Sequence, residues 1–182
     1  TLDPLAAGVL PVLFGRATRL ADCLAWPAKQ YRAEIVFGLE SDTGDLGGQV
    51  SPHQVPPPAP TRSELLAVLG SLVGKQRQVP PAYSARKVGG RKLYDLARAG
   101  EVSTEQLELA AREVTVYSVE LVAQATLGWG TYSSFPAVLV DITCSSGTYV
   151  RQLAARLGQS LGLPACLGFL LRREGGGVGL SD

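Results

Sequence analysis

β-Rich segments constrain the fold of this chain more than any other feature. Residues 114–125 and 135–144 are rich in Val and Ile, and the segment between them holds Gly128 and Gly130, which is typical of a hairpin connection. Residues 29–38 alternate apolar and polar side chains, as a half-buried strand does. The apolar side of that strand holds Tyr31, Ala33, Ile35 and Phe37. These segments predict a largely antiparallel sheet.

Helices are expected between these strands, without a regular βαβ alternation. A capping box from Thr61 to Glu64 predicts a helix that continues to about Val73. A β-rich run at residues 9–14 contains Pro11, which indicates a sheet edge or a bulge. Other helices are expected at residues 16–25, 92–99 and 103–109, and from Thr148, as the N-cap, to Gly162. The mixture predicts an α+β fold.

Composition limits the classes of protein. A chain of 182 residues, 46% of them hydrophobic, suits one domain, and its net charge of +1 does not by itself indicate a nucleic-acid partner. There is no apolar run of about 18 residues, so we expect no membrane span. The widely spaced Cys23, Cys144 and Cys166 are typical of reduced core residues in a cytoplasmic protein. We expect neither zinc nor a nucleotide cofactor, because the ligand spacings and glycine motifs are missing.

Asp3 is the first candidate for chemistry, because it lies in an apolar run with no other acid before Asp22. Such a carboxylate either caps local backbone, with Pro4 as the first residue of a helix, or meets a cation. Both interpretations stay open. In the polar loop at residues 40–50, Asp42 and Asp45 favour Asx hydrogen bonds over a divalent metal site, since the EF-hand spacing is absent.

Residues 75–98 are strongly basic. Seven Lys and Arg minus one Asp give this segment a net charge of +6, and Tyr83 and Tyr94 are interleaved. Such a segment attracts phosphate backbone and offers rings for base stacking, although a solvated surface loop has the same composition. Arg151 lies in the first turn of a predicted helix, where a cation is unfavourable. We therefore expect a carboxylate from elsewhere to compensate it.

Five segments resemble motifs of the TruB-type tRNA pseudouridine-55 synthases, in the order of that family. They are Thr-Leu-Asp-Pro-Leu-Ala-Ala-Gly-Val-Leu-Pro at 1–11, Lys-Gln-Tyr-Arg-Ala at 29–33 with the loop at 38–48, Gln-Val-Pro-Pro-Ala-Tyr-Ser-Ala-Arg-Lys at 78–87, Cys-Ser-Ser-Gly-Thr-Tyr-Val-Arg at 144–151, and Leu-Leu-Arg-Arg at 170–173. The family's upstream Gly-His-x-Gly and Lys-Pro-x-Gly segments are absent, and the chain has no Met. We therefore expect residues 1–182 to be a catalytic domain that lacks its N-terminal part and has no C-terminal RNA-binding domain.

The resemblance implies a pseudouridine synthase-like fold and a set of roles. Asp3 would be the nucleophile, paired with Arg151, and Tyr31 an active-site residue. Leu171 would line the uracil pocket, with Leu170 as the alternative because the spacing from Arg151 is one residue longer than expected. Tyr149 would form a wall of the site. Phosphate contacts would come from Arg86, Lys87 and Arg172.

The implied reaction is base flipping followed by isomerisation of uridine at position 55 in the T stem-loop of tRNA, by a cytoplasmic monomer without cofactor. Two other functions stay open. The basic segment suits an RNA-binding module without catalysis. A carboxylate-dependent hydrolase such as a glycosidase would need a second acid near Asp3, for which Asp42 and Asp45 are the candidates.

Overall fold

A computed structural model describes residues 2–21, 28–53, 55–129, 132–175 and 177–180. They contain a six-stranded sheet of order β1-β10-β2-β9-β8-β5. Its strands are β1 (Ala6–Gly8), β10 (Ala165–Gly175), β2 (Ala28–Phe37), β9 (Tyr132–Ser145), β8 (Arg112–Trp129) and β5 (Gly74–Gln78). Among these strands β1 and β10 pair in parallel and all other neighbours are antiparallel. The expected α+β fold with a largely antiparallel sheet is confirmed.

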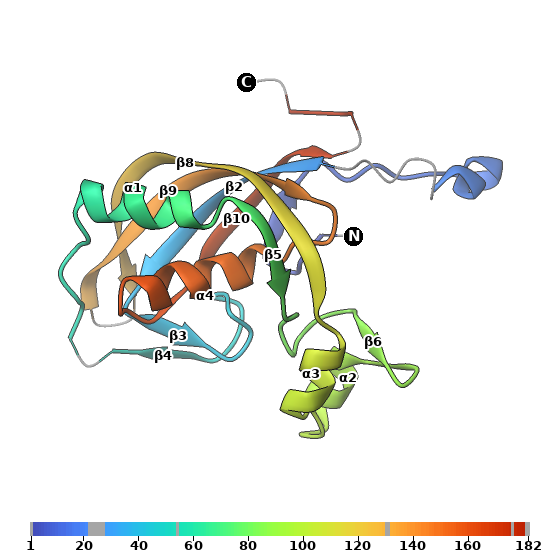
Figure 1. Cartoon of the computed structure of the whole chain (residues 1–182), viewed down its shortest axis with the longest axis horizontal. Coiled ribbons are helices and arrows are strands. Elements are labelled where there is room, and N and C mark those ends of the chain that lie inside the picture. The colour runs from blue at the N-terminus through green and yellow to red at the C-terminus, as the bar shows by residue number, and fades with distance from the viewer. Residues whose placement is uncertain (1, 22–27, 54, 130–131, 176, 181–182) are drawn as a thin grey trace.

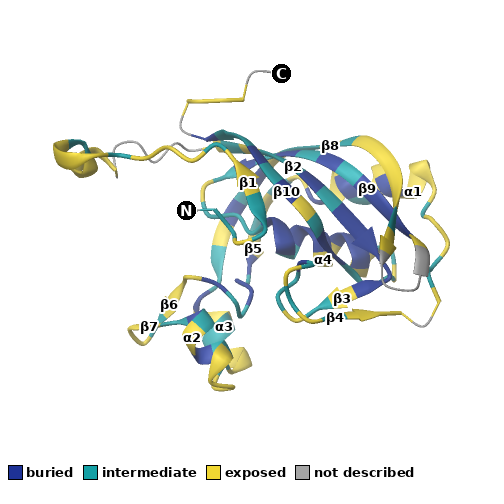
Figure 2. Ribbon diagram, turned by 180° about the vertical axis from the view of Figure 1, so that it is seen from behind, coloured by how far each residue is buried: buried dark blue, intermediate teal, exposed yellow. Residues whose placement is uncertain are grey.

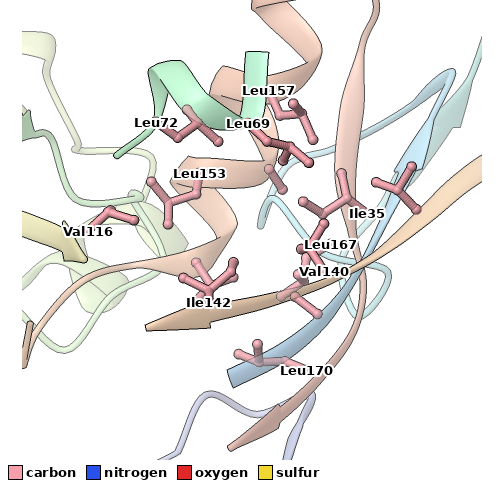
Figure 3. Close-up of a cluster of buried hydrophobic side chains, with 14 of the residues drawn as sticks. Ile35, Leu69, Leu72, Val116, Val140, Ile142, Leu153, Leu157, Leu167 and Leu170 are labelled. Atoms are coloured by element: carbon pink, nitrogen blue, oxygen red, sulfur yellow. The ribbon is translucent and has the colours of Figure 1, made fainter. Parts of the chain in front are cut away.

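Helices α1 (Arg62–Ser71) and α4 (Val150–Ser160) lie on the same face of the sheet (Figure 1). Between them and the strands is the main hydrophobic core, in which Ile35, Leu69 and Leu153 are at most 2% exposed (Figure 3). Ile35 comes from the expected apolar side of β2, with Ala33 and Phe37. The view from behind shows the other face of the sheet without a described helix in front of it (Figure 2).

Local capping signals set the helix starts. Thr61 and Glu64 form the expected capping box at α1, with the Thr61 N–H donating to Glu64 Oε2 at 2.8 Å. Helices α2 (Leu93–Arg98) and α3 (Thr104–Leu109) confirm the two short helices expected near residues 92–109. Both lie below the sheet in the view of Figure 1, beside the hairpin of β6 (Lys87–Val88) and β7 (Arg91–Lys92). Most of the basic segment thus belongs to a small lobe with its own apolar cluster.

The loop between strands β3 (Leu39–Ser41) and β4 (Val50–Pro52) contains the acidic residues considered for metal binding. Asp42 Oδ1 accepts the N–H of Gln49 at 2.8 Å, and Asp45 Oδ1 accepts the N–H of Gly47 at 2.9 Å. These bonds confirm the expected local hydrogen bonding of the two carboxylates. Among the described residues no group of three or more His, Cys, Asp or Glu side chains could hold a metal ion.

Two expectations for the N-terminal region are wrong. The edge strand is β1 at Ala6–Gly8 rather than residues 9–14, because its pairing with β10 ends at the bond from the Val9 N–H to the Arg172 carbonyl (3.0 Å), and Pro11 has no N–H to extend it. In place of the helix expected at 16–25, residues 15–20 form a 3₁₀ turn that buries no side chain. This segment extends away from the sheet, so its apolar residues lack a core to pack against (Figure 1). Residues 22–25 lie outside the described part of the chain.

Two cysteines are buried thiols, as expected for core residues. Burial raises the pKa of Cys144 to about 11 and that of Cys166 to about 12. Cys23 lies outside the described residues. None of the described helices is long and apolar enough to cross a membrane.

Candidate active site

Asp3 and Arg151 meet across almost the whole chain. Arg151 Nε donates a hydrogen bond to Asp3 Oδ2 at 3.0 Å. Of the two interpretations of Asp3, the meeting with a cation is confirmed. The helix N-cap is wrong, since Pro4 opens a turn that the Ala6 N–H closes on the Asp3 carbonyl at 2.9 Å. A proline at the second position of a turn has the φ value it needs there. The turn leaves the Asp3 side chain 28% exposed, whereas the Arg151 side chain beside it is buried.

Arg151 is held from several directions. Its Nη1 donates to the Thr43 carbonyl at 2.8 Å and its Nη2 to the Tyr83 carbonyl at 3.2 Å. Asp45 Oδ2 lies 3.6 Å from Nη1. A guanidinium that is 3% exposed needs such partners, because a buried charge without them is costly. The loop after β3 and the basic segment thus both contact this arginine.

Asp45 is a second carboxylate at the site, and the sequence analysis considered it only as a loop acid and as a candidate second acid of a hydrolase. It is 5% exposed, and its Oδ1 also accepts the Thr43 hydroxyl at 2.8 Å. The sequence contained one usable signal for its role. Arg151 lies in the first turn of a predicted helix, where a cation is unfavourable and needs acidic partners from elsewhere in the chain.

A cavity of about 850 Å³ opens at this ion pair. Side chains far apart in sequence line it, among them Asp3, Tyr31, Tyr149, Arg151, Leu170 and Arg172. Its charged lining consists of five Lys and Arg and two Asp, which gives a net charge of +3. A cavity of this charge beside one accessible carboxylate is suited to a polyanionic ligand.

Tyr31 lies on β2 and points into the cavity from the edge of the main core. Burial raises the pKa of its phenol, and a side-chain hydrogen bond from Arg172 partly opposes this shift. Arg172 is directly across from Tyr31 in the pairing of β10 with β2, and its Nε donates to the Val9 carbonyl at 2.7 Å. The ring is thus held as a neutral phenol with an apolar face beside the ion pair.

Other predicted site residues lie differently. Leu170 lines the cavity, and Leu171, the next residue of β10, does not, because successive side chains of a strand point to opposite faces. Arg86 and Lys87 are exposed at the start of the small lobe and are not part of the cavity lining. Tyr149 and Arg172 do belong to that lining.

Gln78 is a residue supporting the site that the sequence analysis missed. Its Oε1 accepts the Tyr149 N–H at 2.8 Å and its Nε2 donates to the Tyr149 carbonyl at 3.1 Å. Tyr149, rather than the expected Thr148, is the N-cap residue of α4, and the Thr148 hydroxyl instead donates to the Ser145 carbonyl. Gln78 is 6% exposed at the end of β5. A polar residue directly before the stiff Val79-Pro80-Pro81 segment was the signal available in the sequence.

Comparisons with known sequences identify a family for most of the chain. The family described as TruB family pseudouridylate synthase (N terminal domain) matches residues 1–150. The tRNA pseudouridine synthase B of Moorella thermoacetica is 47% identical over 182 residues, which cover all of this chain and 56% of that protein. The protein of the same name from Geobacillus kaustophilus is 41% identical and is covered to 61%. The chain thus spans little more than half the length of these curated relatives.

Solved structures support the fold. A Cbf5-Nop10-Gar1 complex contains a chain that matches 96% of this one, at a TM-score of 0.60 and 24% identity, with 38% of that chain covered. An H/ACA RNP bound to a substrate RNA containing 2′-deoxyuridine matches at a TM-score of 0.56 and 20% identity, covering 96% of this chain and 37% of the other. The sheet, the ion pair and the sequence match over most of the chain lead to one conclusion: the chain belongs to the TruB family of pseudouridylate synthases.

Proposed function

We propose that the protein converts uridine to pseudouridine at position 55 in the T stem-loop of tRNA, with Asp3 as the nucleophile. The observation that carries this proposal is the Arg151–Asp3 pair of 3.0 Å at the wall of a cavity that Tyr31 also lines. The names of the relatives support tRNA as the substrate. The protein acts as a cytoplasmic monomer. It needs no cofactor, because the reaction is an isomerisation.

The reaction breaks the bond from ribose C1′ to uracil N1, turns the base, and joins C1′ to C5. C5 loses its proton and N1 gains one, so the product is an isomer of the substrate. The uridine first leaves its stack, at a cost of about a few kcal/mol. The positive charge of the cavity offsets this cost by binding the RNA backbone. Arg86, Lys87 and Arg172 contribute phosphate contacts, the first two from the small lobe.

The nucleophile needs a fixed orientation, and Arg151 orients the Asp3 carboxylate through the hydrogen bond from Nε. Its target is the ribose C1′ or the base; the alternative is that it removes a proton from the sugar. Tyr31 stacks on the flipped base and relays the proton that leaves C5. Leu170, in place of the expected Leu171, packs on the other face of the base, and Tyr149 closes the side of the pocket.

A tritium-release assay tests this proposal. An RNA hairpin with the T-loop sequence and [5-³H]uridine should release tritium with the wild-type protein and not with Asp3→Asn, while both proteins bind the hairpin. The control is Glu120→Gln, the same change on the exposed surface of β8. Tritium release by Asp3→Asn at the wild-type rate would overturn the nucleophile assignment. Binding by the wild-type protein without any release would support the RNA-binding module instead.

A hydrolase has one observation in its favour, because Asp3 and Asp45 converge on the same guanidinium. However, both carboxylate oxygens of Asp45 are engaged, one by Thr43 and Gly47 and the other by Arg151. Asp45 is therefore poorly placed to protonate a leaving group. Chromatography of the same reaction distinguishes the two, since a hydrolase would release free uracil and an isomerase yields pseudouridine within the RNA.

A further inference from the structure

Part of the cavity wall is formed by cations that do not belong to the Arg151–Asp3 pair. Lys29 is on β2, Arg112 is the first residue of β8, and Arg172 is on β10, and all three line the cavity. Burial lowers the pKa of Lys29, and the nearby charges of Arg172 and Arg112 lower it further. Lys29 thus lies close enough to both arginines to be repelled by them.

Two of these cations have hydrogen-bonding capacity that no described residue uses. Among the described ion pairs none includes Lys29 or Arg112. Arg112 stacks over the ring of Tyr149, 5.4 Å from its centroid, and its Nη2 donates to the Gly147 carbonyl. Its Nε is buried without a hydrogen-bond partner in the described structure. Gly147 lacks the Cβ that would collide with this guanidinium.

A cluster of like charges in a half-buried cavity raises the free energy of the folded protein unless an anion binds there. A phosphodiester group fits, because it accepts several hydrogen bonds and suits both an ammonium and a planar guanidinium. We propose that Lys29 and Arg112, next to Arg172, bind one backbone phosphate of the RNA beside the target uridine. This subsite rests on the proposed function, since it takes the same RNA strand that presents the base to Asp3.

The subsite is tested at Lys29 rather than at Arg112, because Arg112 also stacks on Tyr149 and donates a hydrogen bond to the Gly147 carbonyl. Lys29→Met should weaken binding of the T-loop hairpin by about tenfold, the value of one charge-assisted hydrogen bond. The slope of log Kd against log salt should become shallower by about 0.7 to 0.9. Lys29→Arg should restore both. The control is Arg62→Met, which removes an exposed cation at the start of α1, away from the cavity, and should leave both unchanged.

Replacing single backbone phosphates by uncharged methylphosphonates shows which phosphate Lys29 contacts. Hairpins with a methylphosphonate at single positions flanking the target uridine should bind the wild-type protein about tenfold more weakly at one position. Lys29→Met should show no further loss at that position. Equal losses for both proteins at every position, or a Lys29→Met protein that behaves like Arg62→Met, would overturn the subsite. Neither result affects the proposed isomerisation, which fails if the wild-type protein forms no pseudouridine.

Discussion

Arg151 Nε and Asp3 Oδ2 are 3.0 Å apart although the two residues are separated by 148 positions in the chain. Arg151 occupies the first turn of α4, where the helix dipole disfavours a cation, and Asp3 lies in a turn directly before β1. Asp3 thus compensates the unfavourable position of the Arg151 cation, and Arg151 compensates the charge of Asp3 in its apolar turn. Asp3 is the more exposed partner and lines the cavity, and among the described residues no hydrogen bond to its second oxygen is found.

Replacing Arg151 by Lys should lower the rate of pseudouridine formation by about 100-fold, because a single ammonium cannot satisfy Asp3, Thr43 and Tyr83 together and Asp3 loses its orientation. RNA binding should change by less than about threefold, since the charge is retained. Single-turnover kinetics and filter binding measure the two effects. Arg156→Lys, the same change on the exposed side of α4, is the control. A purely weakened affinity would show that the pair serves binding.

Replacing Gln78 by Leu should destabilise the protein by about 1–3 kcal/mol, because the Tyr149 N–H loses its acceptor, while the Tyr149 carbonyl keeps the bonds from the N–H groups of α4. The turnover rate should also fall, since Tyr149 precedes Arg151 by two residues. Gln78→Glu should retain the bond from the Tyr149 N–H but bury a carboxylate against the Tyr149 carbonyl, so a loss of stability at least as large as that of Gln78→Leu is expected. Urea unfolding and single-turnover rates test this, with Gln124→Leu on β8 as the control. Wild-type stability for Gln78→Leu would contradict the prediction.

Replacing Tyr31 by Phe keeps the ring and removes the hydroxyl. Hairpin affinity should stay near the wild-type value, and the isomerisation rate should fall by about 100-fold or more because the proton relay is lost. Burial raises the pKa of Tyr31 above its ordinary value of 10.0, so the folded phenol stays protonated where an unfolded one ionises. The Tyr31 contribution to stability is therefore present below pH 10 and lost as the pH rises through the folded pKa. An unchanged rate for Tyr31→Phe would limit Tyr31 to stacking.

Replacing Asp141 by Asn should remove a pH-dependent link between three strands. Asp141 on β9 accepts hydrogen bonds from Arg32 on β2 at 2.8 Å and from Arg173 on β10 at 3.1 Å. The bond from Arg32 is the main cause that lowers the pKa of Asp141, so its contribution is complete above the unfolded value of 3.8 and is lost as the pH falls through the folded pKa.

The partly exposed Asp141 pairs are screened by solvent, and the expected loss is about 1 kcal/mol at neutral pH. Urea unfolding at pH 7 and at successively lower pH measures it. The difference between wild type and Asp141→Asn should shrink as the solution becomes more acidic. A difference that did not depend on pH would assign the effect to packing.

Local signals were readable from the sequence because they act over a few residues. The Thr61–Glu64 capping box and the apolar alternation from Tyr31 to Phe37 predicted α1 and β2 correctly. Strand β5 was missed, since its sequence Gly-Lys-Gln-Arg-Gln has no apolar alternation and it forms by pairing with β8. Strand β10 was missed too, because bulges near Gly168 and Arg173 interrupt its pattern.

The sequence alone determined which chemical groups are present: an acid in an apolar turn, a tyrosine on a strand, an arginine at a helix start and a basic segment. Only the tertiary structure decided which of them meet. Strand register placed Leu170 rather than Leu171 in the cavity, and chain packing brought Asp45 and Lys29 to it. The physical reason is that capping and alternation depend on neighbours in sequence, whereas register and ion pairing between distant residues depend on the free energy of the whole fold.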